Sequence, residues 1–277
     1  MNYSLILSIA LYICGCFYMV FGAVIIAINA KSKVNRMFLH LTSSLAIWSF
    51  SYSISTSVPT AEMSAFVRSF SAFGWGIFSS LLLHFVLALT KTKIRLNRRL
   101  LYVALYLPAL INVILFGPFG LLRDRHYLME QTTFGWMNRT PMYTASIWLT
   151  AYYVVFSLAT LIVLFRWWRS IESHTPKKRQ ATLFLASIML LFLIEAVIDA
   201  IPDMLDKKFF PKMPVLFLII PTVMLFIVLK KFGLISETTR ITYSFPEIKK
   251  YLAAERSRLF NTATVIFLLG GALSFLV

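Results

Sequence analysis

The sequence predicts an all-α fold, a polytopic membrane helix bundle of seven transmembrane helices with its N-terminus outside. Apolar residues make up 59% of the 277 residues and charged residues only 14%, whereas a soluble globular chain carries about 25% charged residues. Apolar runs close to the roughly 20 residues that cross a bilayer recur between short basic loops. This spacing indicates membrane spans rather than one large soluble core.

The predicted spans follow one another along the chain with short connections. They are Leu5–Ile28, Met37–Val58, Ala65–Thr90, Leu100–Gly117, Thr144–Phe165, Ala181–Met204 and Val215–Leu229. The first run is too long for a cleaved signal peptide and lacks a basic flank before it. The last run is short and contains Pro221, so its ends are the least defined.

The basic residues are distributed unequally between the two ends of these spans. Segments 31–36, 91–99, 166–180 and 230–261 hold 20 of the 27 Lys and Arg, with four of the 11 acids. Because basic loops stay in the cytoplasm, these segments are predicted to be cytoplasmic and the N-terminus outside. The net charge of +16 is therefore a signal of topology and of attraction to anionic lipid, and no nucleic-acid partner is predicted.

The chain divides into three predicted parts: a seven-span bundle at 1–236, a cytoplasmic connector at 237–261 and an apolar segment at 262–277. The connector is interpreted as an amphipathic helix, because four apolar residues lie near one helical side: Ile248, Tyr251, Leu252 and Leu259. The apolar segment is short for a span. It is interpreted as part of an eighth helix cut at Val277, with a half-inserted helix as the alternative.

Three acids, Glu195, Asp199 and Asp203, form a stripe along one face of the sixth span. With Ala181 at the inner face, the helical rise places Glu195 roughly 21 Å and Asp199 roughly 27 Å across the membrane, and Asp203 near its outer surface. Intramembrane carboxylates are costly and commonly functional. The stripe is interpreted as one wall of a ligand pocket open to the outside, or as partners of Arg68 or of Lys207 and Lys208.

Arg68 lies near the outer end of the third span, and Trp75 shares its helical face. Both are candidate ligand-binding residues together with the acidic stripe. The alternative for Arg68 is snorkelling to the interface. His84, lower on the same span, is interpreted as a hydrogen-bonded packing residue because no acid accompanies it in sequence.

Two further segments carry unusual composition. The second span is rich in Ser and Thr, which allows close helix approach and interhelical hydrogen bonds, so this span is predicted to be buried among its neighbours. The outer loop at 117–143 mixes aromatic and charged residues. It is long for a plain connection and is interpreted as a lid over the bundle mouth or as a surface loop.

Motifs of several enzyme classes are absent from the sequence. It contains no G-x-S-x-G, H-E-x-x-H, C-x-x-C or phosphate-loop pattern. Its two cysteines, Cys14 and Cys16, face different directions on one predicted helix. The sequence therefore predicts no catalytic residues, no cofactor, no metal site and no enzymatic activity of its own.

Several segments, in order, resemble the N-terminal seven-helix sensor region of bacterial histidine kinases and related diguanylate cyclases. They are LAIWSFSYS (45–53), LLLHFVLALT (81–90), KKRQATLFLASI (177–188), AVIDAIPDM (196–204) and KKFGLIS (230–236). The resemblance covers roughly residues 5–240. It places Trp48, His84–Phe85, Arg179–Gln180 and Asp199–Pro202 in the shared pattern and implies no catalytic role for them. The family usually continues into a soluble output domain, whereas residues 262–277 are apolar again.

The resemblance implies a sensory input module in the bacterial cytoplasmic membrane. A small-molecule or lipid-like ligand is expected from the outer side, and a cytoplasmic output domain or protein is expected to receive the signal. A homodimer is expected from the resemblance alone. The acidic stripe also suits a small cation- or proton-coupled transporter, and a scaffold that only anchors a partner is a third interpretation. No inverted repeat accompanies the stripe, which argues against the transporter.

Overall fold

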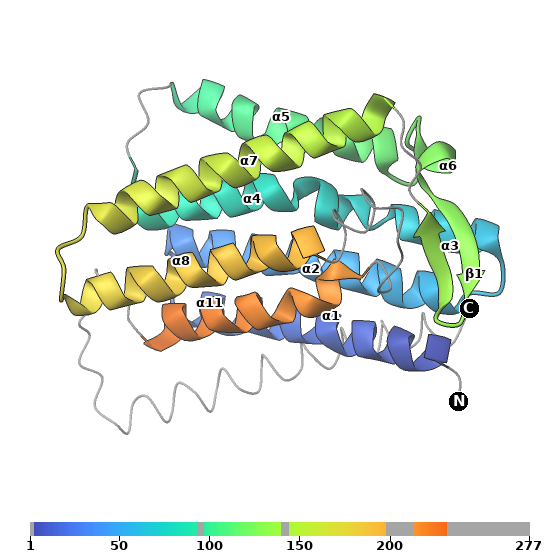
Figure 1. The fold of residues 1–277 in the computed structure, drawn as a ribbon, viewed down its shortest axis with the longest axis horizontal. Helices are drawn as coiled ribbons and strands as arrows, with labels where there is room; N and C mark the ends of the chain where they lie inside the picture. Colours follow the sequence, from blue (N-terminus) through green and yellow to red (C-terminus); the bar gives the residue numbers. More distant parts are fainter. Residues whose placement is uncertain (1–2, 93–96, 140–143, 198–212, 232–277) are drawn as a thin grey trace.

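The computed structural model describes residues 3–92, 97–139, 144–197 and 213–231, in which long helices run side by side as a bundle (Figure 1). Helices α1 (Tyr3–Ile28) and α2 (Lys33–Ser57) form the first pair. Helix α2 begins earlier than predicted because the Ser32 hydroxyl caps it by accepting a hydrogen bond from the Asn35 amide. Ser49 Oγ donates to the Leu11 carbonyl over 2.7 Å and joins the two helices.

Helix α2 lies in the interior of the bundle. It contacts α1, α3, α4 and β2, and most of its hydroxyl residues are buried, among them Thr42, Ser44, Ser49, Ser53 and Ser55. Their hydroxyls bond backbone carbonyls of α2 or of α1. The prediction of a buried second span is confirmed.

The third predicted span is not one continuous helix. Helix α3 (Ala61–Ser69) ends at a turn, and α4 (Ala72–Thr90) follows it. At this turn Ser71 Oγ donates to the Arg68 carbonyl over 2.6 Å. Helix α4 packs closely on α2 at Gly74. A Cβ at this position would lie only 2.5 Å from the Ser44 carbonyl oxygen, so the absence of a side chain allows the close approach.

The remaining long helices lie around the pair formed by α2 and α4. Helices α5 (Arg98–Phe116) and α7 (Thr144–Arg169) contact α4, while α8 (Pro176–Glu195) contacts α7 and α11 (Ile219–Lys231). The short α10 (Pro214–Phe217) precedes α11. The Tyr18 hydroxyl of α1 donates to the Val215 carbonyl of α10 over 2.6 Å, which ties the first helix to the last described ones.

The outer loop folds into a helical turn, α6 (Arg123–His126), and a hairpin of β1 (Leu128–Thr132) and β2 (Gly135–Arg139). The antiparallel register pairs Leu128 with Arg139 and Thr132 with Gly135. Gly135 has a φ of 89°, and a Cβ there would lie 2.3 Å from the Thr56 carbonyl oxygen, so only glycine fits where the hairpin meets α2. The described fold is thus helical with one β-hairpin, which the all-α prediction did not include.

Four of the described helical segments are long and apolar enough to cross a membrane: Tyr3–Ile28, Ala61–Thr90, Arg98–Phe116 and Thr144–Arg169. Helix α2 is long enough, but its hydroxyl residues lower its mean hydropathy. Helices α10 and α11 are short, and the sixth predicted span extends past α8 beyond the described residues. In Ala61–Thr90, 83% of the apolar 18-residue window is buried, against 22% of the corresponding windows in α5 and in α7. Helix α4 is therefore central, and α5 and α7 are peripheral.

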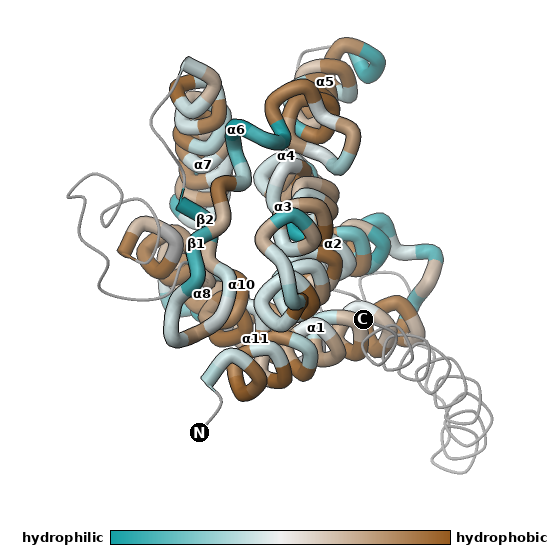
Figure 2. Tube along the Cα trace, turned by 90° about the vertical axis from the view of Figure 1, so that its right-hand side faces the viewer, coloured by the Kyte–Doolittle hydropathy of each residue, from teal (hydrophilic) through white to brown (hydrophobic). Residues whose placement is uncertain are grey.

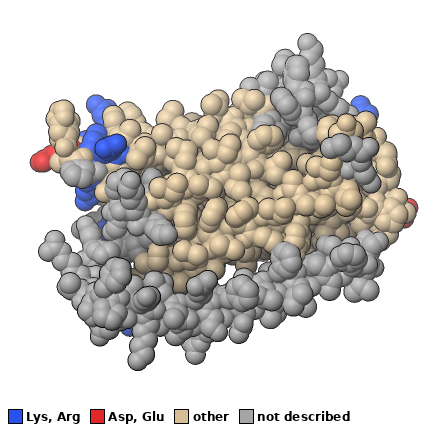
Figure 3. Space-filling view, turned by 90° about the horizontal axis from the view of Figure 1, so that it is seen from below, with Lys and Arg blue, Asp and Glu red and all other residues tan. Residues whose placement is uncertain are grey.

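Charge separates the two ends of the bundle. Figure 3 shows Lys and Arg gathered mainly at one end, where α2 and α5 begin and α7 ends, which we call the basic end. The part of the long flank that is coloured in this view shows few charges. The opposite end holds the hairpin and the start of α1, and we call it the hairpin end (Figures 1 and 2). The predicted connector at 237–261 and the segment at 262–277 lie outside the described residues.

Candidate functional site

The structure places two of the predicted site residues at the hairpin end. Arg68 belongs to the last turn of α3, and Trp75 to the first turn of α4. Glu195 is the final residue of α8, which ends short of the hairpin in Figure 1. Asp199 and Asp203 lie outside the described residues. A contact between the acidic stripe and Arg68 is therefore still a prediction.

Arg68 is fully buried, with 0% of its surface exposed. Its guanidinium carbon lies 3.7 Å from the centre of the Tyr52 ring of α2, a distance at which the cation interacts favourably with the ring face. One terminal nitrogen donates to Ser55 Oγ over 3.3 Å and to the Trp136 carbonyl over 3.4 Å. The snorkelling interpretation is wrong, because the side chain turns inward under the hairpin.

The hydrogen bonds of the Arg68 guanidinium are incomplete. Among the described residues, its Nε and second terminal nitrogen have no acceptor. A buried ion without a counter-charge costs several kcal/mol, and attraction to an aromatic ring offsets only part of that cost. The uncompensated positive charge of this guanidinium and its two nitrogens that lack an acceptor within the described residues would both favour an anion beside it.

Trp75 and Arg68 are linked through the turn between α3 and α4. The Trp75 indole Nε1 donates to Ser71 Oγ over 3.0 Å, and Ser71 Oγ in turn donates to the Arg68 carbonyl. The Trp75 ring packs against Phe116 and His126, with ring centres 5.7 and 5.6 Å away. Trp75 therefore supports the wall of the site beside Arg68.

Tyr127 is a buried residue of this site that the sequence did not single out. Burial raises the pKa of its hydroxyl well above the ordinary value, and the nearby Tyr52 raises it further. Ser71, Trp75 and the Arg68 charge lie close enough to oppose that rise. Tyr127 thus lies close to both predicted residues and stays neutral at physiological pH.

The hairpin covers this cluster from outside the helices. Its β2 strand supplies the Trp136 carbonyl to Arg68, and the Trp136 indole donates to the Val58 carbonyl over 2.9 Å. Figure 2, which faces the hairpin end, shows β1 and β2 crossing that end beside α3. This placement supports the lid interpretation of the outer loop. The length and mixed composition of the loop suggested a lid, but nothing in them indicated that the Trp136 carbonyl reaches Arg68.

Comparison with known proteins identifies one family. The pattern of the N-terminal 7TM region of histidine kinase matches residues 5–228. The match includes Arg68, Trp75 and Glu195 and all but the ends of the described chain. No curated protein and no solved structure matches the chain.

Proposed function

Because the chain belongs to the family of the N-terminal 7TM region of histidine kinase, we propose that it is a sensory input module that receives a ligand at the hairpin end. The matched family is a membrane sensor region of signal transduction rather than a catalytic domain. The family supports a multi-pass protein of the bacterial inner membrane. The basic end would face the cytoplasm and the N-terminus the outside, in agreement with the positive-inside rule.

The observation that carries the proposal is the buried and incompletely bonded Arg68 guanidinium. A carboxylate or phosphate matches the planar donor fork of arginine better than any neutral group. We therefore expect the ligand to be small and to present an anionic group to Arg68. Tyr52, Tyr127 and Trp75 would supply apolar contact around it.

The acidic stripe would form a second wall. Glu195 at the end of α8, with Asp199 and Asp203 following it in sequence, would meet a cationic or polar part of the same ligand. A ligand of this kind shifts a conformational equilibrium only through its different affinity for the two states. The two conformations would differ in how well they present the Arg68 guanidinium to the anionic group, because occupation compensates the buried charge only where the two groups meet.

The signal would leave at the basic end. Helix α2 carries Tyr52 and Ser55 at the site and begins at Lys33 at the opposite end, so a shift at Arg68 acts on an element that runs the length of the bundle. A cytoplasmic output domain or partner protein would receive it through the predicted connector at 237–261. A homodimer would fit the family and stays a prediction.

The test is ligand binding to the protein in lipid nanodiscs. A panel of mono- and dicarboxylates, amino acids and phosphate esters is titrated, and thermal stabilisation is measured. We expect Arg68→Gln to abolish the stabilisation seen in the wild type. Arg125→Gln is the matched control, because Arg125 is an exposed arginine of the same end. A ligand that stabilises Arg68→Gln and wild type equally would contradict the site.

The transporter alternative has its own measurement. Uptake of a cation or proton-coupled solute into proteoliposomes, abolished by Glu195→Gln, would favour a carrier. Binding without uptake would favour the sensor.

A further inference from the structure

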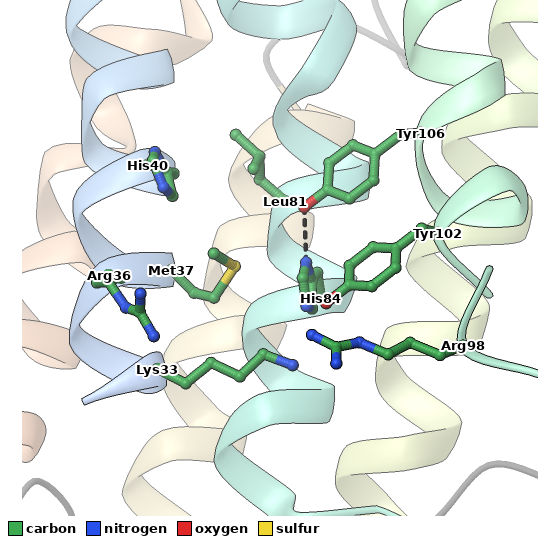
Figure 4. A pocket seen from close by; sticks show the side chains of 9 residues that line it. All are labelled: Lys33, Arg36, Met37, His40, Leu81, His84, Arg98, Tyr102 and Tyr106. Atoms are coloured by element: carbon green, nitrogen blue, oxygen red, sulfur yellow. Dashed lines mark hydrogen bonds between the residues drawn. The ribbon is translucent and has the colours of Figure 1, made fainter. Parts of the chain in front are cut away.

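A cavity lies at the basic end, at the other end of α4 from Arg68. Its volume is about 510 Å³, within the range of small-molecule sites. Figure 4 shows side chains of α2, α4 and α5 converging on it. The lining residues are Lys33, Arg36, Met37, His40, Leu81, His84, Arg98, Tyr102 and Tyr106.

The charges of this cavity are all of one sign. Lys33 and Arg36 come from α2 and Arg98 from α5, and no carboxylate belongs to the lining. Within the described residues, no ion pair joins these three cations to an acid. Helices α2 and α5 both begin at this end, so the positive ends of their dipoles add to the same field. The cavity is therefore electrostatically complementary to an anion.

The floor of the cavity supplies ordered polar groups. His84 is buried, and its Nδ1 is hydrogen-bonded to the Tyr106 hydroxyl over 2.6 Å, which confirms the expectation of a hydrogen-bonded histidine. The Tyr102 ring meets the His84 ring edge-on at 5.5 Å. Lys33 and Arg98 extend toward the Tyr102 hydroxyl from opposite sides (Figure 4). The cationic groups of Lys33 on α2 and Arg98 on α5 thus lie close together beside Tyr102.

Apolar side chains surround the cavity. Met37 and Leu81 belong to its wall. Helix α5 presents a row of exposed apolar side chains above Arg98, namely Leu100, Val103, Leu107, Leu110 and Ile114. An occupant with an anionic head at Arg98 and an apolar body along α5 would match both surfaces. A soluble anion would use only the first of them.

We propose that this cavity binds the phosphate of an anionic phospholipid from the leaflet at the basic end. Lys33, Arg36 and Arg98 hold the phosphate, and the acyl chains lie against α5. Basic pockets between membrane helices on the cytoplasmic side suit such headgroups. The absence of a carboxylate among the lining residues disfavours a choline headgroup, whose quaternary ammonium would meet the same cations. This inference goes beyond the proposed function and involves none of the residues at Arg68.

The experiment is native mass spectrometry of the detergent-solubilised protein titrated with phosphatidylglycerol or with phosphatidylcholine of the same acyl chains. The cavity variant is Lys33→Gln with Arg98→Gln. The matched control is Lys31→Gln with Arg99→Gln, because these neighbours are exposed, do not line the cavity and change the net charge equally. We expect the cavity variant to weaken phosphatidylglycerol binding about tenfold or more, since each lost bond to a charged group is worth roughly one tenfold step.

The same titration decides between sources of phosphate. Soluble glycerol phosphate, added as competitor, should displace phosphatidylglycerol weakly, because it lacks the chains that contact α5. Displacement at equal concentration would overturn the lipid as occupant and assign the cavity to a soluble phosphate. Equal weakening in the control variant, or equal binding of the two lipids, would overturn the cavity as a phosphate site. Arg98→Lys keeps the charge and should retain most of the binding.

Discussion

Arg68 and Tyr52 face each other across the contact between α3 and α2, with the guanidinium carbon 3.7 Å from the ring centre. They are 16 residues apart in sequence, on helices separated by a turn at the hairpin end. Arg68 is fully buried and Tyr52 partly buried, and among the described residues the guanidinium has only long hydrogen bonds, of 3.3 and 3.4 Å. The buried charge of Arg68 therefore lowers the free energy of unfolding, and its donors that no described residue pairs can bind an anionic group.

Arg68→Met should leave the ligand-free protein as stable as wild type or more stable, by about 1–2 kcal/mol. The reason is that replacing a poorly compensated buried ion by an apolar side chain of similar length removes its desolvation cost. The measurement is thermal unfolding in nanodiscs without ligand. Arg68→Ala is the comparison, since it leaves a cavity and should destabilise. A large loss of stability in Arg68→Met would show that the charge already has a counter-ion.

Tyr127→Phe should remove part of the alkaline loss of stability. Burial raises the pKa of Tyr127 in the folded protein above the value of about 10 in the unfolded chain. Its neutral form therefore stabilises the fold below pH 10, and that contribution is lost as pH rises further. The wild type should lose about 1.4 kcal/mol per pH unit above 10 relative to Tyr127→Phe. Parallel stability curves from pH 8 to 11 would contradict this expectation.

Gly135→Ala should detach the hairpin from the end of α2. The new Cβ would lie 2.3 Å from the Thr56 carbonyl oxygen at a φ of 89°, a backbone conformation and a contact that alanine tolerates poorly. Faster hydrogen–deuterium exchange over 128–139 and easier proteolysis there should report the change. Thr133→Ala, at the exposed turn of the same hairpin, is the control. Unchanged exchange in Gly135→Ala would mean that the hairpin does not depend on this contact.

Asp199→Asn should weaken the response to a ligand while leaving the fold intact, as expected for one wall of a pocket. Combined with Arg68→Gln, its effect on stability should be additive, because the proposed partner of Arg68 is the ligand. Thermal unfolding of the single and double variants measures this. A coupling of 0.5 kcal/mol or more between the two sites would instead identify Asp199 as the counter-ion.

The sequence alone predicted the helices whose bounds depend on local apolar periodicity and capping residues. The first span was predicted as Leu5–Ile28 and is Tyr3–Ile28, and the fourth was predicted to begin at Leu100 and begins at Arg98. Apolar periodicity and capping residues act within a few positions, so they are visible in one sequence. The same holds for the burial of the second span, whose hydroxyls predicted close helix contacts.

The candidate site was predictable only in part. Arg68 and Trp75 were singled out because the sequence pattern places a charge and an aromatic ring on one face of a predicted helix, although the structure carries them on two helices, α3 and α4. Tyr52, Tyr127 and Trp136 come from distant segments, and their approach to Arg68 depends on how α3 breaks at Ser71 and how the hairpin folds back. Such contacts follow from tertiary packing, which local periodicity does not encode.

The hydroxyl residues of α2 also bear on how the protein enters the membrane. A helix of this polarity gains little by partitioning alone into lipid, and its hydroxyls need partners there. The bonds from Ser49 and Ser53 to carbonyls of α1 provide them. During synthesis α1 emerges first, so α2 would leave the insertion machinery as one half of a helical hairpin with α1. The pair, rather than α2 alone, is then the smallest unit in which α2 can enter the bilayer.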